Sequence, residues 1–297
     1  MSNSGNRIVY LNGDYLPETE AKVSIFDRGY LLADAVYEYT ATIGGALIEF
    51  DAHMARLQRS VDELGMDYSL DREAMLAMHR ELVQRNALDT GGVYLQISRG
   101  VADRDFAFPK GLKPTIMAFT QEMNFLDNPI NDTGLKVVSV EDGRWMRRDI
   151  KSVQLLYTAM AKTQANEAGA HDAFFVKDGF VTEATSANAF IIRNGCIVTR
   201  ALSQDILHGV TRKAVLELAR RRNLAIEERA FTIAEAQEAD EVFITASPVY
   251  ALPVVEVDGK QVASGKPGRL TQELRQLFID EAVARAVPGY PASAEAG

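Results

Sequence analysis

The residue with the clearest chemical potential is Lys151, which stands where a cluster of charged residues gives way to an apolar helical pattern over residues 153–168. A primary amine can form a Schiff base with a carbonyl carbon and can carry a proton. Most lysines are instead solvated surface residues. Lys151 is therefore a candidate whose support must come from residues elsewhere in the chain.

The second candidate is a carboxylate, Glu183, at the end of a predicted strand over residues 180–183. A polar run over residues 184–188 follows it and separates it from the next apolar strand. A carboxylate in this position can contact a buried ring nitrogen. Taken alone, a glutamate at a strand end is more often solvated.

Two hydroxyl-bearing turns have the chemistry to bind a phosphate. Gly209-Val210-Thr211 opens a predicted helix, whose first N–H groups and partial positive charge attract anions. Thr245-Ala246-Ser247 lies at the end of a predicted strand. Taken singly, the first turn is typical of ordinary helix capping, and neither turn matches a nucleotide-binding glycine motif. An amine, an acid and two such turns are together the parts that hold a pyridine aldehyde phosphate as a Schiff base.

Composition excludes several other classes of function. The net charge of -9 and the pI near 5.1 disfavour a nucleic-acid partner, because a polyanion is repelled. The four histidines lack metal-ligand spacing, so we expect no metal site. The single cysteine, Cys196, excludes an intramolecular disulfide and is predicted to be a packed strand residue. Without a signal peptide or a long apolar run, we expect a cytoplasmic protein that does not enter the membrane.

The chain must position these residues with more than one domain, because 297 residues exceed the usual size of a single core. We predict a small N-terminal α/β domain over residues 1–121 and a linker over residues 122–133. A larger C-terminal domain carrying Lys151 is predicted over residues 134–286, followed by a disordered tail over residues 287–297.

Periodicity and turn residues predict the elements of these domains. Strands are expected at residues 7–11, 23–26, 35–42, 93–99, 114–120, 136–141, 173–176, 180–183, 189–192, 196–199, 241–245 and 254–257. Helices are expected at residues 51–64, from residue 71 onward, and at residues 153–167, 210–222, 234–239 and 270–286. Asp178-Gly179 and Asn194-Gly195 are predicted hairpin turns.

The order of the motifs resembles a known family. Arg144-Trp145 precedes Asp149-Ile150-Lys151-Ser152, then comes Val181-Thr182-Glu183-Ala184-Thr185-Ser186-Ala187-Asn188, and then Gly209-Val210-Thr211-Arg212. Together they resemble the fold-type IV pyridoxal phosphate enzymes, and most of all the D-amino acid aminotransferases, over nearly the whole chain. The resemblance implies a mixed α/β fold of two domains with pyridoxal 5′-phosphate between them. It also implies a homodimer whose partner contributes to the pocket.

The resemblance also assigns roles to residues. It makes Lys151 the Schiff-base lysine and proton carrier, and Glu183 the partner of the pyridine nitrogen. The other residues that it implies for cofactor binding are Arg56, Ser186, Ala187, Asn188, Leu207, Gly209, Val210, Thr211, Ala246 and Ser247. Tyr37 and Arg104 match positions that hold the substrate carboxylate.

One departure from the family affects the substrate. The family's carboxylate clamp reads Arg-x-His, whereas this chain reads Arg104-Asp105-Phe106. The missing histidine leaves room for a clamp built with another arginine, and the candidates are Arg28, Arg144, Arg147 and Arg148.

The expected function is transfer of the amino group of a D-amino acid, such as D-alanine or D-glutamate, to a 2-oxo acid. Four alternatives share the cofactor residues: a branched-chain L-amino acid aminotransferase, an (R)-amine aminotransferase, an aminodeoxychorismate lyase and a non-catalytic protein that binds the cofactor.

Overall fold

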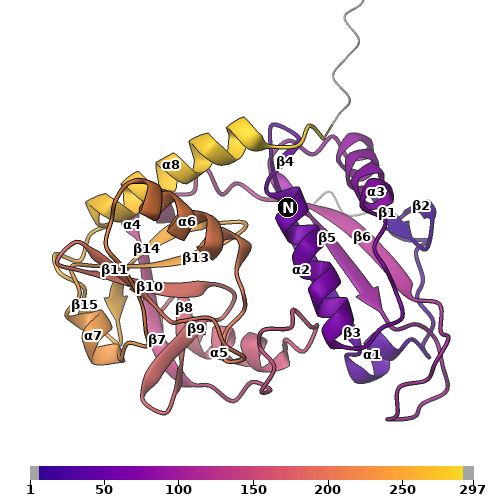
Figure 1. Cartoon of the computed structure of the whole chain (residues 1–297), viewed down its shortest axis with the longest axis horizontal. Helices are drawn as coiled ribbons and strands as arrows, with labels where there is room; N and C mark the ends of the chain where they lie inside the picture. Colours follow the sequence, from indigo (N-terminus) through magenta and orange to yellow (C-terminus); the bar gives the residue numbers. More distant parts are fainter. Residues whose placement is uncertain (1–6, 290–297) are drawn as a thin grey trace, which may run out of the picture. The chain divides into compact units, whose positions relative to one another are not determined.

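The computed structural model describes residues 7–289, which divide into two compact units (Figure 1). Unit 1 comprises residues up to Asn124, the short segment Ile150–Val153 and the residues from Ala282 onward. Unit 2 comprises Phe125–Asp149 and Gln154–Glu281.

Unit 1 is built on a six-stranded sheet in the order β2-β1-β6-β5-β3-β4, in which every neighbouring pair is antiparallel. Its strands are β1 (Ile8–Leu11), β2 (Asp14–Pro17), β3 (Ala35–Ile43), β4 (Ala46–Leu47), β5 (Gly91–Ser98) and β6 (Thr115–Glu122). Its helices are α1 (Arg28–Leu32), α2 (Phe50–Glu63) and α3 (Arg72–Arg85).

Side chains of β3 alternate between the two faces of this sheet, as a strand requires. Val36, Glu38 and Thr40 are buried, whereas Tyr37 and Tyr39 are half-buried. Helix α2 packs on the face that carries Glu38 and buries Leu57 and Val61 completely. Each such aliphatic side chain contributes about 1.5–3 kcal/mol by burial. The α2 face toward β3 is therefore fixed.

Unit 2 contains a nine-stranded mixed sheet in the order β12-β11-β10-β13-β14-β7-β8-β9, with β15 paired to β14. Its strands are β7 (Leu135–Glu141), β8 (Asp172–Lys177), β9 (Phe180–Ala184), β10 (Asn188–Arg193), β11 (Cys196–Thr199), β12 (Ile226–Glu228), β13 (Glu241–Ala246), β14 (Tyr250–Val257) and β15 (Lys260–Gln261). Its helices are α4 (Ile130–Thr133), α5 (Leu156–Glu167), α6 (Val210–Arg221), α7 (Ile233–Gln237) and most of α8 (Arg269–Arg285).

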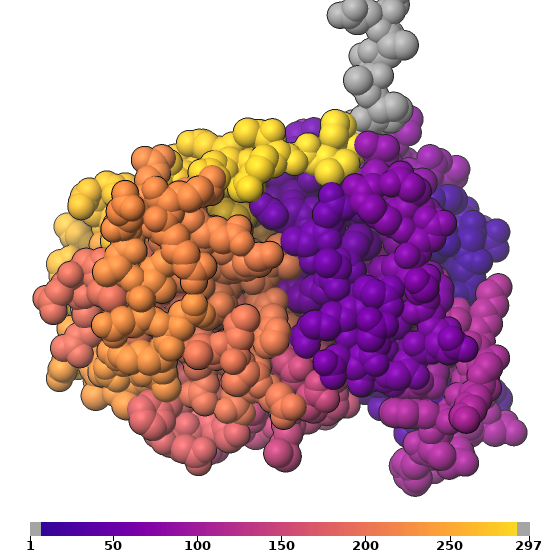
Figure 2. Space-filling view, in the orientation of Figure 1, coloured from indigo at the N-terminus to yellow at the C-terminus, as the bar shows by residue number. Residues whose placement is uncertain are grey.

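Helix α8 covers part of the surface of unit 2. Figure 2 shows its yellow atoms lying against the orange atoms of that unit. Leu274 and Phe278 are buried, and the Phe278 ring lies 5.1 Å from the ring of Tyr250 on β14. The main apolar core of unit 2 includes Phe174, Ile191 and Phe231.

The predicted hairpins of unit 2 are present. Asp178 and Gly179 join β8 to β9, and Asn194 and Gly195 join β10 to β11. All four residues have positive φ angles, between 50° and 82°, which two-residue hairpin turns need and which Asn, Asp and Gly tolerate best. These turns fix the register that places Glu183 near the end of β9.

Three expectations differ from the structure. Residues 23–26 form no strand, and Val23, Ile25 and Phe26 are exposed, because no neighbouring strand pairs with them. Helix α5 begins at Leu156 rather than at residue 153. Within the predicted disordered tail, Val287 pairs with Leu47 through backbone hydrogen bonds in both directions; residues 290–297 lie outside the described chain.

The units also differ from the predicted domains at Lys151. The segment Ile150–Val153 belongs to unit 1, although the residues on both sides of it belong to unit 2. The backbone N–H of Tyr37 donates to Lys151 O at 2.9 Å, and the N–H of Val153 donates to Ala35 O at 3.1 Å. The segment therefore runs along β3 as an added edge, a long-range pairing that local periodicity does not reveal. The predicted linker contains the end of β6 and the short helix α4.

Candidate active site

Lys151 lies beside the aromatic residues of β3. Its Nζ atom is 4.1 Å from the centroid of the Tyr37 ring, and its backbone N–H donates to Ser60 Oγ of α2 at 3.3 Å. The Tyr37 ring stacks on Tyr94, and Tyr94 stacks on Phe119, each with an interplanar angle of 22°. The amine is therefore held against a rigid aromatic row.

Beneath this row, on the face covered by α2, lies a buried charged cluster of Glu38, His53 and Arg56. Arg56 donates from Nε and Nη2 to the two carboxylate oxygens of Glu38, both at 2.7 Å, and His53 Nδ1 lies 2.7 Å from Glu38 Oε2. Burial alone would raise the pKa of Glu38, but the charge of Arg56 and these hydrogen bonds hold it well below its usual range. Burial lowers the pKa of His53, so Glu38 and Arg56 form the charged pair.

In unit 2, Glu183 is a buried carboxylate surrounded by hydrogen-bond donors. Arg144 Nη1 donates to its Oε1 at 2.5 Å, while Asn188 Nδ2 and the backbone N–H of Leu207 donate to its Oε2 at 3.1 and 3.0 Å. Burial raises the pKa of Glu183, and Arg144 and the Leu207 amide oppose this only in part. A raised pKa means that this carboxylate takes up a proton more readily than an exposed glutamate does.

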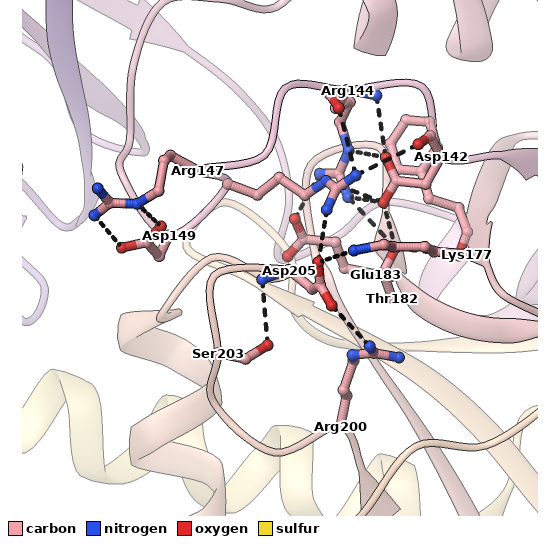
Figure 3. Close-up of polar contacts among 12 residues, drawn as sticks. Asp142, Arg144, Arg147, Asp149, Lys177, Thr182, Glu183, Arg200, Ser203 and Asp205 are labelled. Carbon is pink, nitrogen blue, oxygen red and sulfur yellow. Dashed lines mark hydrogen bonds and ion pairs between the residues drawn. The ribbon is translucent and has the colours of Figure 1, made fainter.

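Arg144 is shared between two carboxylates, as Figure 3 shows. Its Nε and Nη2 atoms donate to Asp142 at 2.9 and 2.8 Å, and its guanidinium lies 4.1 Å from the centroid of the Phe175 ring. Asp142 also accepts a hydrogen bond from Thr182 at 2.7 Å. These contacts fix the direction from which Arg144 reaches Glu183.

Asn188 links Glu183 to the first turn of α6. Besides its bond to Glu183, it donates to Leu207 O at 2.9 Å. A Cβ atom on Gly209 would lie 2.1 Å from Asn188 Oδ1, so this position requires glycine. Gly209 is the N-cap of α6 and supplies no side-chain hydrogen bond, so no side chain caps the N–H groups of Val210 and Thr211 from that position.

The end of strand β13 lies beside Asn188. Thr245 on β13 pairs with Asn188 on β10, and Ala246 and Ser247 follow it. The Thr245 hydroxyl is buried and has no hydrogen-bond partner among the described residues. A buried hydroxyl without a partner, next to an uncapped helix N-terminus, provides donors for an anion.

The structure thus brings together most of the predicted residues within each unit. In unit 1, Lys151 contacts Tyr37 and α2, which carries Arg56. In unit 2, Glu183, Asn188, Leu207, Gly209 and Thr245 form one connected group. Ala187 is buried in the turn between β9 and β10, whereas Ser186 in the same turn is exposed.

Arg104 stands apart from Tyr37. It is exposed in the loop between β5 and β6, and its guanidinium lies 4.8 Å from the centroid of the Phe106 ring. No hydrogen bond or ion pair within the described chain joins it to Tyr37. The four alternative arginines all have carboxylate partners: Arg28 with Asp34, Arg144 with Asp142 and Glu183, Arg147 with Asp149, and Arg148 with Asp205.

The sequence alone does not show which side chains bind Arg56 and Arg144. Glu38 carried a signal, because it occupies a core-facing position of an alternating strand, where a charged residue needs a partner. Asp142 carried none, since only the folded chain shows that it binds Arg144.

Comparison with known proteins identifies the family. Residues 35–257 match the model of the family "Amino-transferase class IV". The chain belongs to the class IV aminotransferases. This aminotransferase is 39% identical over 267 residues to the D-alanine aminotransferase of Bacillus licheniformis, covering 90% of this chain and 94% of that protein. It is 37% identical over 273 residues to the D-alanine aminotransferase of Staphylococcus aureus strain COL, covering 91% and 96%.

The fold of this aminotransferase also matches solved structures. The branched-chain amino acid aminotransferase of Thermobaculum terrenum, solved in its PLP-form, superposes with a TM-score of 0.81, covering 95% of this chain and 95% of that one at 21% identity. The predicted mixed α/β fold is confirmed. Within residues 7–289, no helix is long and apolar enough to cross a membrane, and no three His, Cys, Asp or Glu side chains are grouped to hold a metal ion.

Proposed function

We propose that this aminotransferase uses pyridoxal 5′-phosphate to move the amino group of a D-amino acid, such as D-alanine or D-glutamate, to a 2-oxo acid. The observation that carries the proposal is the likeness to D-alanine aminotransferases at up to 39% identity over 90% of the chain. The surroundings of Lys151 within unit 1 and of Glu183 within unit 2 support it.

The residues of unit 2 fit the two ends of the cofactor. Glu183 is a buried carboxylate suited to a ring nitrogen, and the uncapped N-terminus of α6 with the segment Thr245–Ser247 at the end of β13 suits a phosphate. Asn188 connects these two groups by hydrogen bonds and close packing. Arg56 and Lys151 of unit 1 would complete the set, with Arg56 at the phosphate and Lys151 at the aldehyde.

When bound, pyridoxal 5′-phosphate supplies an aldehyde that condenses with amines and a ring that withdraws electrons. Lys151 would hold the aldehyde in the resting enzyme and afterwards move a proton at Nζ. Glu183 would keep a proton on the ring nitrogen, since a carboxylate stabilises the adjacent cation. Val210 and Thr211 would bind phosphate through their backbone N–H groups.

Arg104 is the arginine best suited to bind the substrate carboxylate. The other four candidates already pair with carboxylates of this chain, so recruiting one would break an existing ion pair. Arg104 faces solvent, and its guanidinium stacks on the Phe106 ring. Charge-assisted, bidentate contacts suit an arginine for carboxylate recognition. Tyr37, beside Lys151, is the second residue proposed to contact the substrate carboxylate.

A second copy of the chain would enclose Arg104. Two loops of unit 1 are joined by the Asp27–Val101 bridge and by a hydrogen bond from Ala102 N to Phe26 O. These loops, together with helix α1, which carries Tyr30, expose several large apolar side chains, namely Ile25, Phe26, Tyr30, Val101, Phe106 and Phe108. Contiguous apolar surface of this kind marks an interface, and most soluble oligomers are symmetric homodimers. We propose a homodimer that buries these loops.

The deciding experiment records the absorption spectrum of the purified protein and its activity with D-alanine and 2-oxoglutarate. We expect a coloured protein that borohydride bleaches, and activity that Lys151→Ala abolishes. A colourless protein without turnover would refute the proposal. Arg104→Gln should raise the KM for D-alanine by about tenfold or more. An unchanged KM would instead favour another anchor.

A donor panel separates the alternatives. Preference for L-leucine or for (R)-1-phenylethylamine would indicate a branched-chain or an amine aminotransferase, and pyruvate released from aminodeoxychorismate alone would indicate the lyase. Bound cofactor without turnover on any donor would indicate a cofactor-binding protein.

A further inference from the structure

Glu38 is the most completely buried carboxylate of unit 1 near Lys151, with none of its side chain exposed. It lies next to Tyr37 on β3, on the opposite face of the strand. Arg56 binds both of its carboxylate oxygens at 2.7 Å, and His53 lies 2.7 Å from one of them. Two parallel N–H···O bonds fix the plane of the guanidinium as well as its distance.

This contact costs free energy to bury, so its presence needs a reason. A buried ion pair carries a large desolvation penalty, and apolar residues of the same volume are often equally or more stabilising. Van der Waals packing alone would therefore serve α2 and β3 at least as well. The pair fixes a charged group, which an apolar contact does not.

The cluster is tied to the segment that carries Lys151. Ser60 lies one helical turn after Arg56 on α2 and accepts a hydrogen bond from the N–H of Lys151. The N–H of Tyr37, beside Glu38, donates to Lys151 O. Within unit 1, the same helix and strand therefore position both Arg56 and the lysine.

We propose that Glu38 is a positioning residue, which fixes the guanidinium of Arg56 for the phosphate group of the cofactor. The inference rests on the proposed function, in which Arg56 binds that phosphate. Glu38 would touch neither cofactor nor substrate. Glu38 would therefore affect the binding only of ligands that carry the phosphate.

The test compares pyridoxal 5′-phosphate with pyridoxal, which lacks the phosphate. Cofactor-free protein is titrated with each compound, and both dissociation constants are measured by absorption and by quenching of Trp145 fluorescence. In Glu38→Gln, we expect pyridoxal 5′-phosphate to bind about tenfold or more weakly, as when a charge-assisted contact is lost. Pyridoxal should bind as it does to the wild type.

Asp34→Asn is a matched control. Asp34 is also buried in unit 1 and accepts hydrogen bonds from two arginine Nε atoms, those of Arg28 at 2.7 Å and Arg99 at 2.8 Å. The substitution removes a comparable buried charge away from Arg56. We expect it to lower stability while leaving the ratio of the two dissociation constants unchanged.

Each outcome decides the question. If Glu38→Gln weakens both compounds equally, or weakens neither, Glu38 does not act through the phosphate and the inference is wrong. If Glu38→Gln does not fold, Glu38→Asp, which keeps the charge on a shorter side chain, should still reduce the preference for the phosphorylated compound, and an unchanged preference overturns the inference. A wild-type protein that binds neither compound overturns the proposed function, and the inference with it.

Discussion

Glu38 in unit 1 and Glu183 in unit 2 are both buried glutamates, and each accepts hydrogen bonds from an arginine. Arg56 gives two N–H groups to Glu38. Arg144 gives one N–H group to Glu183 and two to Asp142. Arg56 thus binds both oxygens of one carboxylate, whereas Arg144 divides its N–H groups between two carboxylates.

This division sets the two carboxylates apart electrostatically. The pKa of Glu38 is held below its usual range, because Arg56 and His53 overcome the effect of burial. The pKa of Glu183 is raised, because burial outweighs its share of Arg144. Glu38 is thus a fixed anion that orients a neighbour, whereas Glu183 is suited to share a proton.

The largest expected effect on stability comes from the divided arginine. Arg144→Met leaves Asp142 and Glu183 buried without their main cation, so we expect the free energy of unfolding to fall by about 3–5 kcal/mol. Urea unfolding at pH 7 measures it. Arg229→Met removes a more exposed arginine of unit 2 that pairs with Glu227 and Glu235, and it should cost at most about 1 kcal/mol. Equal losses in the two variants would show that Arg144 is not needed by the buried carboxylates.

The next effect concerns turnover. Glu183→Gln keeps the shape of the side chain but cannot carry the charge, so we expect kcat to fall by about 100- to 1000-fold in protein that retains the cofactor. Glu241→Gln is the matched control in unit 2. Like Glu183, Glu241 accepts backbone hydrogen bonds, in its case from the N–H groups of Leu270 and Thr271, and it lies outside the proposed site. Wild-type kcat in cofactor-loaded Glu183→Gln would rule out a proton-holding role for this carboxylate.

The contrast between the two glutamates also marks how far the sequence could predict the site. Turn residues and alternation placed Glu183 and Asn188 correctly at the ends of β9 and β10, because these signals are local. Gly209 and Thr211 were likewise placed at the start of α6. Such positions follow from short-range backbone preferences.

Long-range pairings were not accessible in the same way. The sequence leaves Arg144 among the candidate substrate anchors, but in the folded chain it binds Glu183, which lies 39 positions further along the chain. The predicted C-terminal domain contains Lys151, whereas backbone pairing with β3 places it in unit 1. Both outcomes depend on tertiary packing, which selects among partners that the sequence leaves equivalent.

A change of pH should alter the contributions of the two glutamates to stability in opposite directions. Glu38 has a lowered pKa in the folded state, so its stabilisation is present above its unfolded pKa and is lost as the pH falls. Glu183 has a raised pKa, so its contribution is present below its unfolded pKa and is lost as the pH rises through its folded pKa.

Urea unfolding of the cofactor-free protein between pH 4 and pH 8 tests this sign. The cost of Glu38→Gln should grow with rising pH, whereas Glu183→Gln should become more favourable with rising pH, each by an amount on the order of 1 kcal/mol. Parallel slopes for the two variants would contradict the electrostatic distinction.

The smallest expected effect on stability concerns the N-termini of two helices, α3 and α6. Asp71 caps α3 in unit 1 by accepting hydrogen bonds from Glu73 N and Ala74 N, whereas Gly209 offers α6 in unit 2 no such side chain. Asp71→Ala should therefore lower the free energy of unfolding by about 1 kcal/mol, with or without pyridoxal 5′-phosphate.

The rise in Tm that the cofactor produces should be the same in Asp71→Ala as in the wild type, because the proposed phosphate site is at α6 and not at α3. In Gly209→Ala the added Cβ would displace Asn188, and the rise should shrink. If Asp71→Ala reduced the cofactor-dependent rise as much as Gly209→Ala, the cofactor would not be acting at α6. If only Gly209→Ala does so, the missing cap of α6 is supplied by the phosphate, since a ligand that binds only the folded protein stabilises it by mass action.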